Sequence, residues 1–390
     1  MLALGLLTIT AFGVWFYAFG VLIDPISSDT GWGTTALGLT YGGAQVLTGL
    51  LAFVGGRLLD RFDAPAPFLL HAIGGGGLLL VASAASNIWF FGLSFAIGGG
   101  IIGGTGFYSI TTAAAARLRP DQPDQAIARL TIIGAFCSPI YLPLTAWLVT
   151  IWDWRSVLRA LTAATIVAAM IAAVAARGAR SSTAAPSAQP MRAMRRSLRQ
   201  PVVRRMLIAY LLAGIGFASV LVYQVPVMTS AGIGLATAGV IGGLRGFFQV
   251  FGRVGLTGLI GRFGSERLLQ VAYGVAAIGV AFLLVGSVPA GIAYAVLAGV
   301  AIGASSPLQA IHSRAVFDEG DLGLLMGLQG AAIGVAGGVG PALGGVLNDT
   351  TSSWVPIVAV SIGCFVLAAA LLSTRVPDDS HDGGDRRRVS

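Results

Sequence analysis

The sequence contains no lysine, and all 24 of its basic residues are arginines. Charged residues make up only 10% of the 390 positions, whereas soluble domains carry about 25%. A chain with so little charge cannot cover a soluble fold with polar surface. Because a phosphate-binding P-loop needs a lysine, the chain also cannot be its own ATPase of that type.

Cysteine and histidine are equally scarce. The two cysteines, Cys137 and Cys364, lie inside apolar runs and predict buried thiols instead of a disulfide framework. The three histidines, His71, His312 and His381, are scattered and form no metal-binding motif. With no nucleophile–base pair and no metal-ligand pattern, we predict that the protein is not an enzyme and binds neither a metal nor another cofactor.

Long apolar runs dominate instead, with 55% hydrophobic residues and a mean hydropathy of +0.83. Each run can cross a hydrocarbon layer of about 30 Å as a helix, and the first lacks the basic segment and cleavage site of a signal peptide. We predict an all-α, polytopic membrane protein with twelve transmembrane helices in two pseudo-symmetric six-helix halves. The expected domains are an N-terminal bundle (1–176), a cytoplasmic linker (177–205), a C-terminal bundle (206–375) and a cytoplasmic tail (376–390). The predicted spans are 2–23, 34–56, 66–86, 88–112, 127–151, 156–176, 206–229, 237–261, 268–287, 289–312, 322–347 and 354–373.

The placement of the arginines predicts the orientation. With the N-terminus in the cytoplasm, 20 of the 24 arginines fall in cytoplasmic loops or the tail, eight of them between residues 177 and 205. Membrane proteins keep positive charge on the cytoplasmic side, so we expect both termini in the cytoplasm and the helices in the inner membrane of a bacterial cell. The net charge of +8 then reflects topology and contact with anionic lipid. It implies no nucleic-acid partner, and no oligomer is required.

Three polar residues interrupt the eighth apolar run. Arg245, Gln249 and Arg253 follow at four-residue steps, which places them within about 80° of one another on a helix. An arginine at the centre of a span costs about 2.5–3.5 kcal/mol, and no acidic residue lies mid-span to pair with these two. A carboxylate substrate would supply the missing charge and match the planar guanidinium. The alternative, a structural arginine satisfied by backbone carbonyls or water, remains open.

Other polar residues within the spans are weaker candidates for substrate binding, because each could equally form a hydrogen bond to a neighbouring helix. The predicted substrate-binding set is Arg253, Arg245, Gln249, Tyr17, Tyr223 and Gln224.

The two halves repeat one another at the ends of their second helices. The first half reads Gly56-Arg57-Leu58-Leu59-Asp60-Arg61-Phe62, and the second reads Gly261-Arg262-Phe263 at the equivalent point. Duplicated six-helix halves are a recurring plan of transporters, which bind their substrate near the midplane between the halves.

On these residues the chain resembles the major facilitator superfamily. The family signature G-x-L-x-D-R-x-G is matched by Gly56, Leu58, Asp60 and Arg61, while Asp63 replaces its last glycine. The resemblance covers the whole chain and implies a secondary transporter that works by alternating access. It also implies a cytoplasmic latch between helices formed by Asp60 and Arg61, although the two residues could instead simply cap a loop. The predicted gating residues are Gly56, Asp60, Arg61 and Arg262.

Within this superfamily the chain resembles the monocarboxylate-transporter and oxalate–formate-antiporter branch. In that branch the arginine that matches Arg253 binds the substrate carboxylate, which implies a monocarboxylate-like organic anion as substrate. Relatives that symport protons carry an aspartate four residues earlier, where this chain has Gln249, so that proton route is in doubt and antiport or another proton site remains open. The segments that carry the resemblance are Tyr17-Ala18-Phe19-Gly20-Val21, Gly31-Trp32, Tyr41-Gly42-Gly43, Trp154-Arg155 and Arg253.

The main alternative is a drug or other small-molecule efflux carrier of the same superfamily. Drug–proton antiporters carry a GPxxGG run on their fifth helix, where this chain reads Cys137-Ser138-Pro139. A matching run, Gly340 to Gly345, lies on the eleventh predicted helix instead. The membrane subunit of an ATP-driven permease is a more distant alternative, disfavoured by the duplicated halves.

Overall fold

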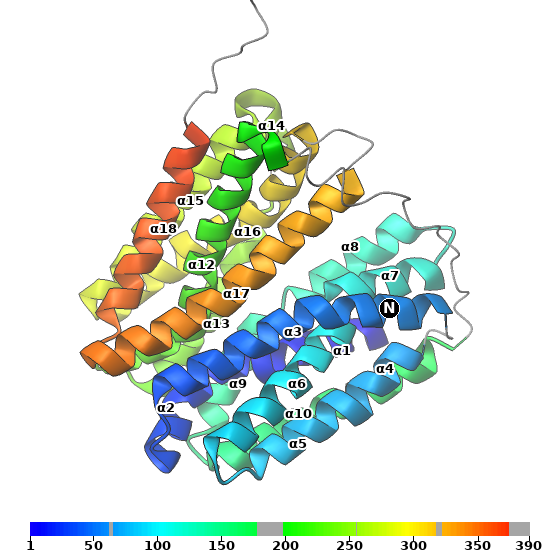
Figure 1. The fold of residues 1–390 in the computed structure, drawn as a ribbon, viewed down its shortest axis with the longest axis vertical. Coiled ribbons are helices and arrows are strands. Elements are labelled where there is room, and N and C mark those ends of the chain that lie inside the picture. The colour runs from blue at the N-terminus through cyan, green and yellow to red at the C-terminus, as the bar shows by residue number, and fades with distance from the viewer. Residues whose placement is uncertain (62–64, 178–197, 255, 317–321, 374–390) are drawn as a thin grey trace, which may run out of the picture.

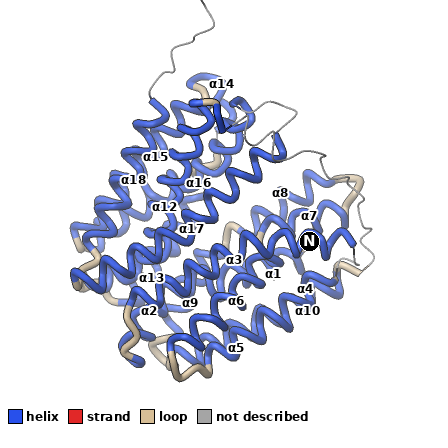
Figure 2. Tube along the Cα trace, in the orientation of Figure 1, coloured by secondary structure: helices blue, strands red, loops and turns tan. Residues whose placement is uncertain are grey.

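A computed structural model describes residues 1–61, 65–177, 198–254, 256–316 and 322–373. Every regular element within these ranges is a helix, as Figure 2 shows. The predicted all-α class is therefore confirmed. Most of the expected linker and the expected tail lie outside the described residues.

The first half forms six helical rods, several of which are divided by π-helical turns or short breaks. The helices are α1 (Leu2–Ala11), η1 (Phe12–Tyr17), α2 (Ala18–Thr30), α3 (Thr34–Arg61), α4 (Ala66–Leu70), η2 (His71–Gly76), α5 (Gly77–Ser83), α6 (Ile88–Gly106), α7 (Tyr108–Leu118), α8 (Pro123–Gly134), α9 (Cys137–Leu148) and α10 (Trp154–Ala175).

The second half repeats the plan with six further rods. Its helices are α12 (Pro201–Ser230), α13 (Leu235–Phe251), α14 (Leu256–Phe263), α15 (Ser265–Ala281), η3 (Phe282–Val285), α16 (Val288–Val316), α17 (Leu322–Thr351) and α18 (Val355–Ser373).

These rods are long and apolar enough for a membrane. Among the described residues, ten helical stretches could span a bilayer by length and composition, and α13 is a shorter apolar helix. The 30-residue helix α17 completes the predicted set of twelve. Large apolar side chains are exposed on the outer surface, including Leu2, Phe53, Ile73 and Trp89, each at least 74% exposed. Such a surface suits lipid and not water.

The twelve rods form two bundles that contact each other through a few helices (Figure 1). Helices α3 and α17 run side by side between the bundles, and α13 packs on α9 while α12 packs on α2. Glycines permit these approaches. A Cβ atom on Gly42 would lie only 2.5 Å from the carbonyl oxygen of Gly338, so a larger residue would force the two helices apart.

One predicted helix is interrupted. The eighth apolar run, expected to be continuous over 237–261, divides into α13 and α14 after Phe251. Gly252 is the first residue after α13. The carbonyl oxygen of Val300 on α16 lies so close to it that a side chain at position 252 would collide with that oxygen. The glycine-rich sequence after α13 therefore favours close packing on α16 over a continuous helix.

Candidate functional site

The two bundles meet at one end of the molecule and separate toward the other. On α3, residues from Thr34 to Gly42 contact the last part of α17. Farther along the same helices, Thr48 and Gly49 of α3 and Gly330 and Gly334 of α17 line a cavity instead. The cavity lies toward the arginine-rich end, which carries Arg57, Arg117 and Arg177. We call the other end, where Thr34 lies, the outer end.

This central cavity has a volume of about 470 Å³ and is lined by both bundles. Phe12 and Phe107 stack in parallel at its wall with ring centroids 3.7 Å apart, and Phe16 stands edge-on to Phe107 at 6.0 Å. The polar lining consists of uncharged amides and hydroxyls, among them Gln45, Thr48, Ser305 and Gln309. A volume of this size is typical of small-molecule sites.

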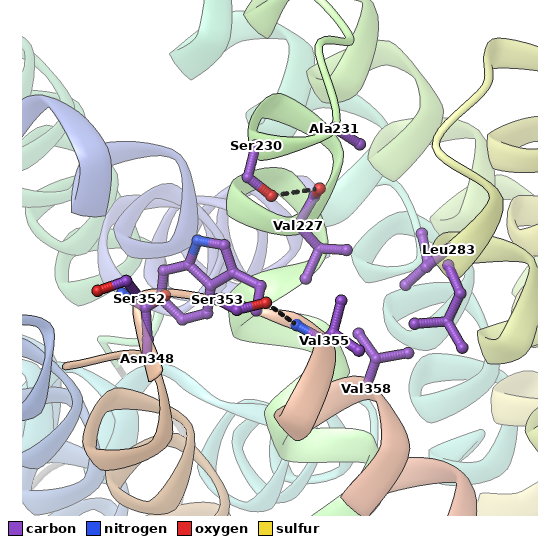
Figure 3. A pocket seen from close by; sticks show the side chains of 11 residues that line it. Val227, Ser230, Ala231, Leu283, Asn348, Ser352, Ser353, Val355 and Val358 are labelled. Atoms are coloured by element: carbon purple, nitrogen blue, oxygen red, sulfur yellow. Dashed lines mark hydrogen bonds between the residues drawn. The ribbon is translucent and has the colours of Figure 1, made fainter. Parts of the chain in front are cut away.

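A second hollow of about 320 Å³ opens at the outer end (Figure 3). Ser230 and Val227 of α12, Val355 and Val358 of α18, and Asn348 of α17 contribute to its wall. All its lining residues belong to the second bundle. Because a substrate path must run between the halves, we place the site in the central cavity.

Arg245 lies fully buried on α13, at the contact between the two bundles. Its Nε donates to the Gln224 Oε1 at 3.0 Å, and its Nη2 donates to the Ser138 Oγ at 3.1 Å. Gln224 belongs to the second bundle and Ser138 to the first, so the guanidinium bridges the halves. Gly246, the next residue, lets α9 come close enough for Ser138 to be reached.

The partners of Arg245 are all neutral. The Tyr294 hydroxyl donates to the same oxygen of Gln224 at 3.0 Å, and the Tyr17 hydroxyl lies beside the guanidinium. The remaining nitrogen, Nη1, is buried and has no hydrogen-bond partner among the described residues. Tyr17 packs edge-on against Phe16, a wall residue of the cavity, at 4.9 Å. Among the described residues, Arg245 is not part of the cavity lining; it lies behind Tyr17, which packs on the wall residue Phe16.

Arg253 does not lie where the sequence predicted. It follows the end of α13 in a turn and is exposed, so it does not share a helical face with Arg245 and Gln249. The break after Phe251 explains the difference, because the four-residue spacing orders side chains only within a continuous helix. The positive charge of Arg253 has only a small electrostatic effect on Tyr17 and Tyr108 of the first bundle, whereas that of Arg245 on Tyr17 is larger.

The other predicted binding residues divide between the site and the scaffold. Gln224 is a direct partner of Arg245. Gln249 is half-buried on α13, and its backbone packs against Gly303 of α16. Tyr223 is buried, donates a short hydrogen bond to the carbonyl oxygen of Pro341 and stacks near Trp354 at 4.7 Å. Tyr223 therefore ties α12 to α17, and its hydroxyl also lies beside Gly38 of α3 in the first bundle.

The predicted gating residues lie at the arginine-rich end. Gly56 lies in α3 with open space beside it, and Arg262 is exposed at the end of α14, over the ring of Phe263. Asp60 and Arg61 belong to the last turn of α3, but their side chains fall outside the described part, so the predicted latch stays a prediction. Close by, Arg117 donates to the carbonyl oxygen of Leu59 at 2.6 Å.

Sequence reasoning missed the partners that position Arg245. Ser138 and Tyr294 are ordinary polar residues on distant apolar runs, and no spacing relates them to position 245. It also missed the carboxylates that join the bundles at the outer end. The Thr229 hydroxyl donates to Asp24 at 3.0 Å, and the backbone N–H of Thr34 donates to Asp349 at 2.9 Å.

The two bundles and the cavity between them define a polytopic membrane transporter. The model of the Major Facilitator Superfamily matches residues 4–295 and 277–389, so the chain belongs to that superfamily. It is a transporter and not an enzyme.

Solved structures of transporters share this fold. The nucleoside transporter NupG aligns with a TM-score of 0.79 at 13% identity, over 96% of this chain and 99% of that chain. A bacterial homolog of the human lysosomal transporter Spinster aligns with a TM-score of 0.76 at 15% identity, over 95% of each chain. The xylose transporter XylE from E. coli aligns with a TM-score of 0.72 at 14% identity, over 97% of this chain and 96% of that chain. A comparison with curated proteins finds no match.

Proposed function

We propose that this chain is a secondary transporter that moves a small, monocarboxylate-like organic anion across the bacterial inner membrane by alternating access. Arg245 and Arg253 bind the carboxylate, together with Tyr17. The observation that carries the proposal is the fully buried guanidinium of Arg245, which has only neutral partners and one nitrogen without a hydrogen bond within the described part of the chain.

Electrostatics supports an anionic ligand at Arg245. A buried charge without a counter-ion is costly, and a buried donor without a partner adds about 1–3 kcal/mol. Gln224, Ser138 and Tyr17 supply dipoles but no negative charge. A carboxylate would remove both costs, because it brings the opposite charge and accepts the hydrogen bond that Nη1 leaves unmade.

The position of Arg253 supports a role earlier in binding. It is exposed, and its charge has a small electrostatic effect on Tyr17 and Tyr108 of the first bundle. An anion that enters from the arginine-rich end would meet Arg253 before the buried Arg245. Tyr17, which lies beside Arg245, can donate its hydroxyl proton to the same carboxylate. Gln249 cannot titrate, so it cannot carry a coupling proton.

The structure also contains an observation that favours the efflux alternative. The described residues of the cavity wall include Phe12, Phe16, Phe107 and Phe217, and none of those described is charged. Such a wall suits an apolar, uncharged body. A neutral amphipathic compound is therefore the second candidate substrate, and it would not need the arginines.

Binding measurements on the purified protein separate the two candidates. Titration with small carboxylates and with their amides should give binding of the acids only. Arg245→Gln should weaken that binding about ten- to a hundredfold, the effect of losing a charge-assisted hydrogen bond. Arg159→Gln is the matched control, because this arginine is exposed and bonds Ser83 within the first bundle. Equal binding of acids and amides, unchanged by Arg245→Gln, would favour the neutral substrate.

A further inference from the structure

The first turn of α3 takes its hydrogen bonds from an unusual source. Gly33 occupies the position before the helix, since its carbonyl oxygen accepts the N–H of Leu37 at 3.3 Å, but it has no side chain to cap the free N–H groups. The backbone N–H groups of Thr34 and Thr35 donate instead to the two carboxylate oxygens of Asp349, at 2.9 and 2.7 Å. The Thr34 hydroxyl donates to the same carboxylate at 2.7 Å.

This cap comes from the other half of the protein. Asp349 lies near the end of α17 in the second bundle, whereas α3 belongs to the first. Two other helices of the first bundle show the usual local arrangement. Asn87 caps α6 through the N–H of Phe90 at 2.8 Å, and Asp153 caps α10 through the N–H of Ser156 at 3.0 Å.

Gly33 makes room for the foreign carboxylate. A Cβ atom at this position would lie 2.9 Å from the Asp349 Oδ2, closer than real Cβ contacts. Gly33 does not have the positive φ that requires glycine, unlike its neighbour Gly31. The absence of a side chain thus both leaves α3 without a local cap and opens the space that Asp349 fills.

Alternating access makes this contact conditional. The outer end must open for the substrate to pass, and opening separates α3 from α17. We propose that Asp349 is a gating residue, whose carboxylate holds the outer end closed by capping α3 of the opposite half. Opening exchanges this cap for water, and closing restores it. The role is independent of what the substrate is.

If Asp349 holds the outer end closed, its loss should raise the population of molecules with an open outer end. A measurement of the distance between the outer ends of the two bundles can detect this change. Spin labels are placed at Ser28 and Val285, which are exposed at the outer ends of the two bundles, after Cys137 and Cys364 have been replaced by serine. Asp349→Ala should raise the fraction of long distances roughly fivefold, the factor that corresponds to the loss of one typical helix cap. The exposure of Asp349 keeps the effect this modest, because water competes for its bonds.

Asp153→Ala is the matched control. Hydrogen bonds from Ser156 keep the pKa of Asp153 below its ordinary value, so it too is a charged cap, but it caps a helix of its own half. Its loss should lower the unfolding temperature without changing the distances. An equal shift in both variants, or none in Asp349→Ala, would overturn the proposal.

A double variant separates gating from folding. Gly33→Asp combined with Asp349→Ala supplies α3 with a local cap but does not restore the contact between α3 and residue 349 of α17. The unfolding temperature should recover, while the long distances persist. Recovery of the short distances as well would show that Asp349 acts only on the stability of α3, and would refute the gate.

Discussion

The close approach of α3 and α17 predicts that one added methyl group will open the outer end. In Gly42→Ala the new Cβ atom would lie 2.5 Å from the backbone oxygen of Gly338, and it needs at least 3.0 Å. Since a backbone atom cannot rotate away as a side chain can, the helices must separate. Overpacking of this kind costs about 1–3 kcal/mol.

In the proposed opening of the outer end α3 separates from α17, so that cost falls on the state whose outer end is closed. We therefore expect a shift of about 5- to 150-fold toward opening at the outer end. The labels at Ser28 and Val285 measure it. Gly43→Ala is the control, since its Cβ atom would lie at an ordinary 3.4 Å from Ala96 within the same bundle. Identical distance distributions for Gly42→Ala and Gly43→Ala would refute the packing argument.

Three further predictions concern topology, the latch and substrate binding. Reporter fusions at Ser182 and Ser390 should both read as cytoplasmic, because the arginines gather on that side; two periplasmic readings would reverse the orientation. Asp60→Asn should shift the population toward the inward-facing state and slow turnover more than it weakens binding, and unchanged cysteine accessibility at the cytoplasmic side would argue against the latch. Arg253→Lys should restore only part of the transport lost in Arg253→Ala, because it keeps the charge without the bidentate fork; full recovery would mean that charge alone suffices.

The sequence was sufficient for the architecture. Twelve apolar runs separated by polar loops predicted the helices, and Gly56, Leu58, Asp60 and Arg61 pointed to the superfamily that the whole chain matches. These features are local, so they can be recognised without knowing which helices are neighbours. Buried arginine was also recognisable, because a charge within an apolar run is costly wherever it packs.

The contacts of the site could not be predicted in the same way. Arg253 was misplaced because the run over 237–261 was expected to be continuous, whereas α13 ends at Phe251, where Gly252 packs against the backbone of Val300 on α16. The bond from Arg245 to Ser138 joins residues 107 positions apart in different bundles. The sequence analysis did not single out Asp349, since its role as a cap requires the partner helix of the other half. Each of these facts belongs to tertiary packing.

Uptake into proteoliposomes tests the assignment of Arg245 and Arg253 to a carboxylate. The wild-type protein is compared with Arg245→Gln and Arg253→Ala, each given a small monocarboxylate and its neutral amide. We predict uptake of the acid by the wild type, little uptake of the amide, and a loss of acid uptake of about ten- to a hundredfold or more in either variant. Equal uptake of acid and amide by the wild type, undiminished in both variants, would show that the arginines are structural and that the substrate is not an anion.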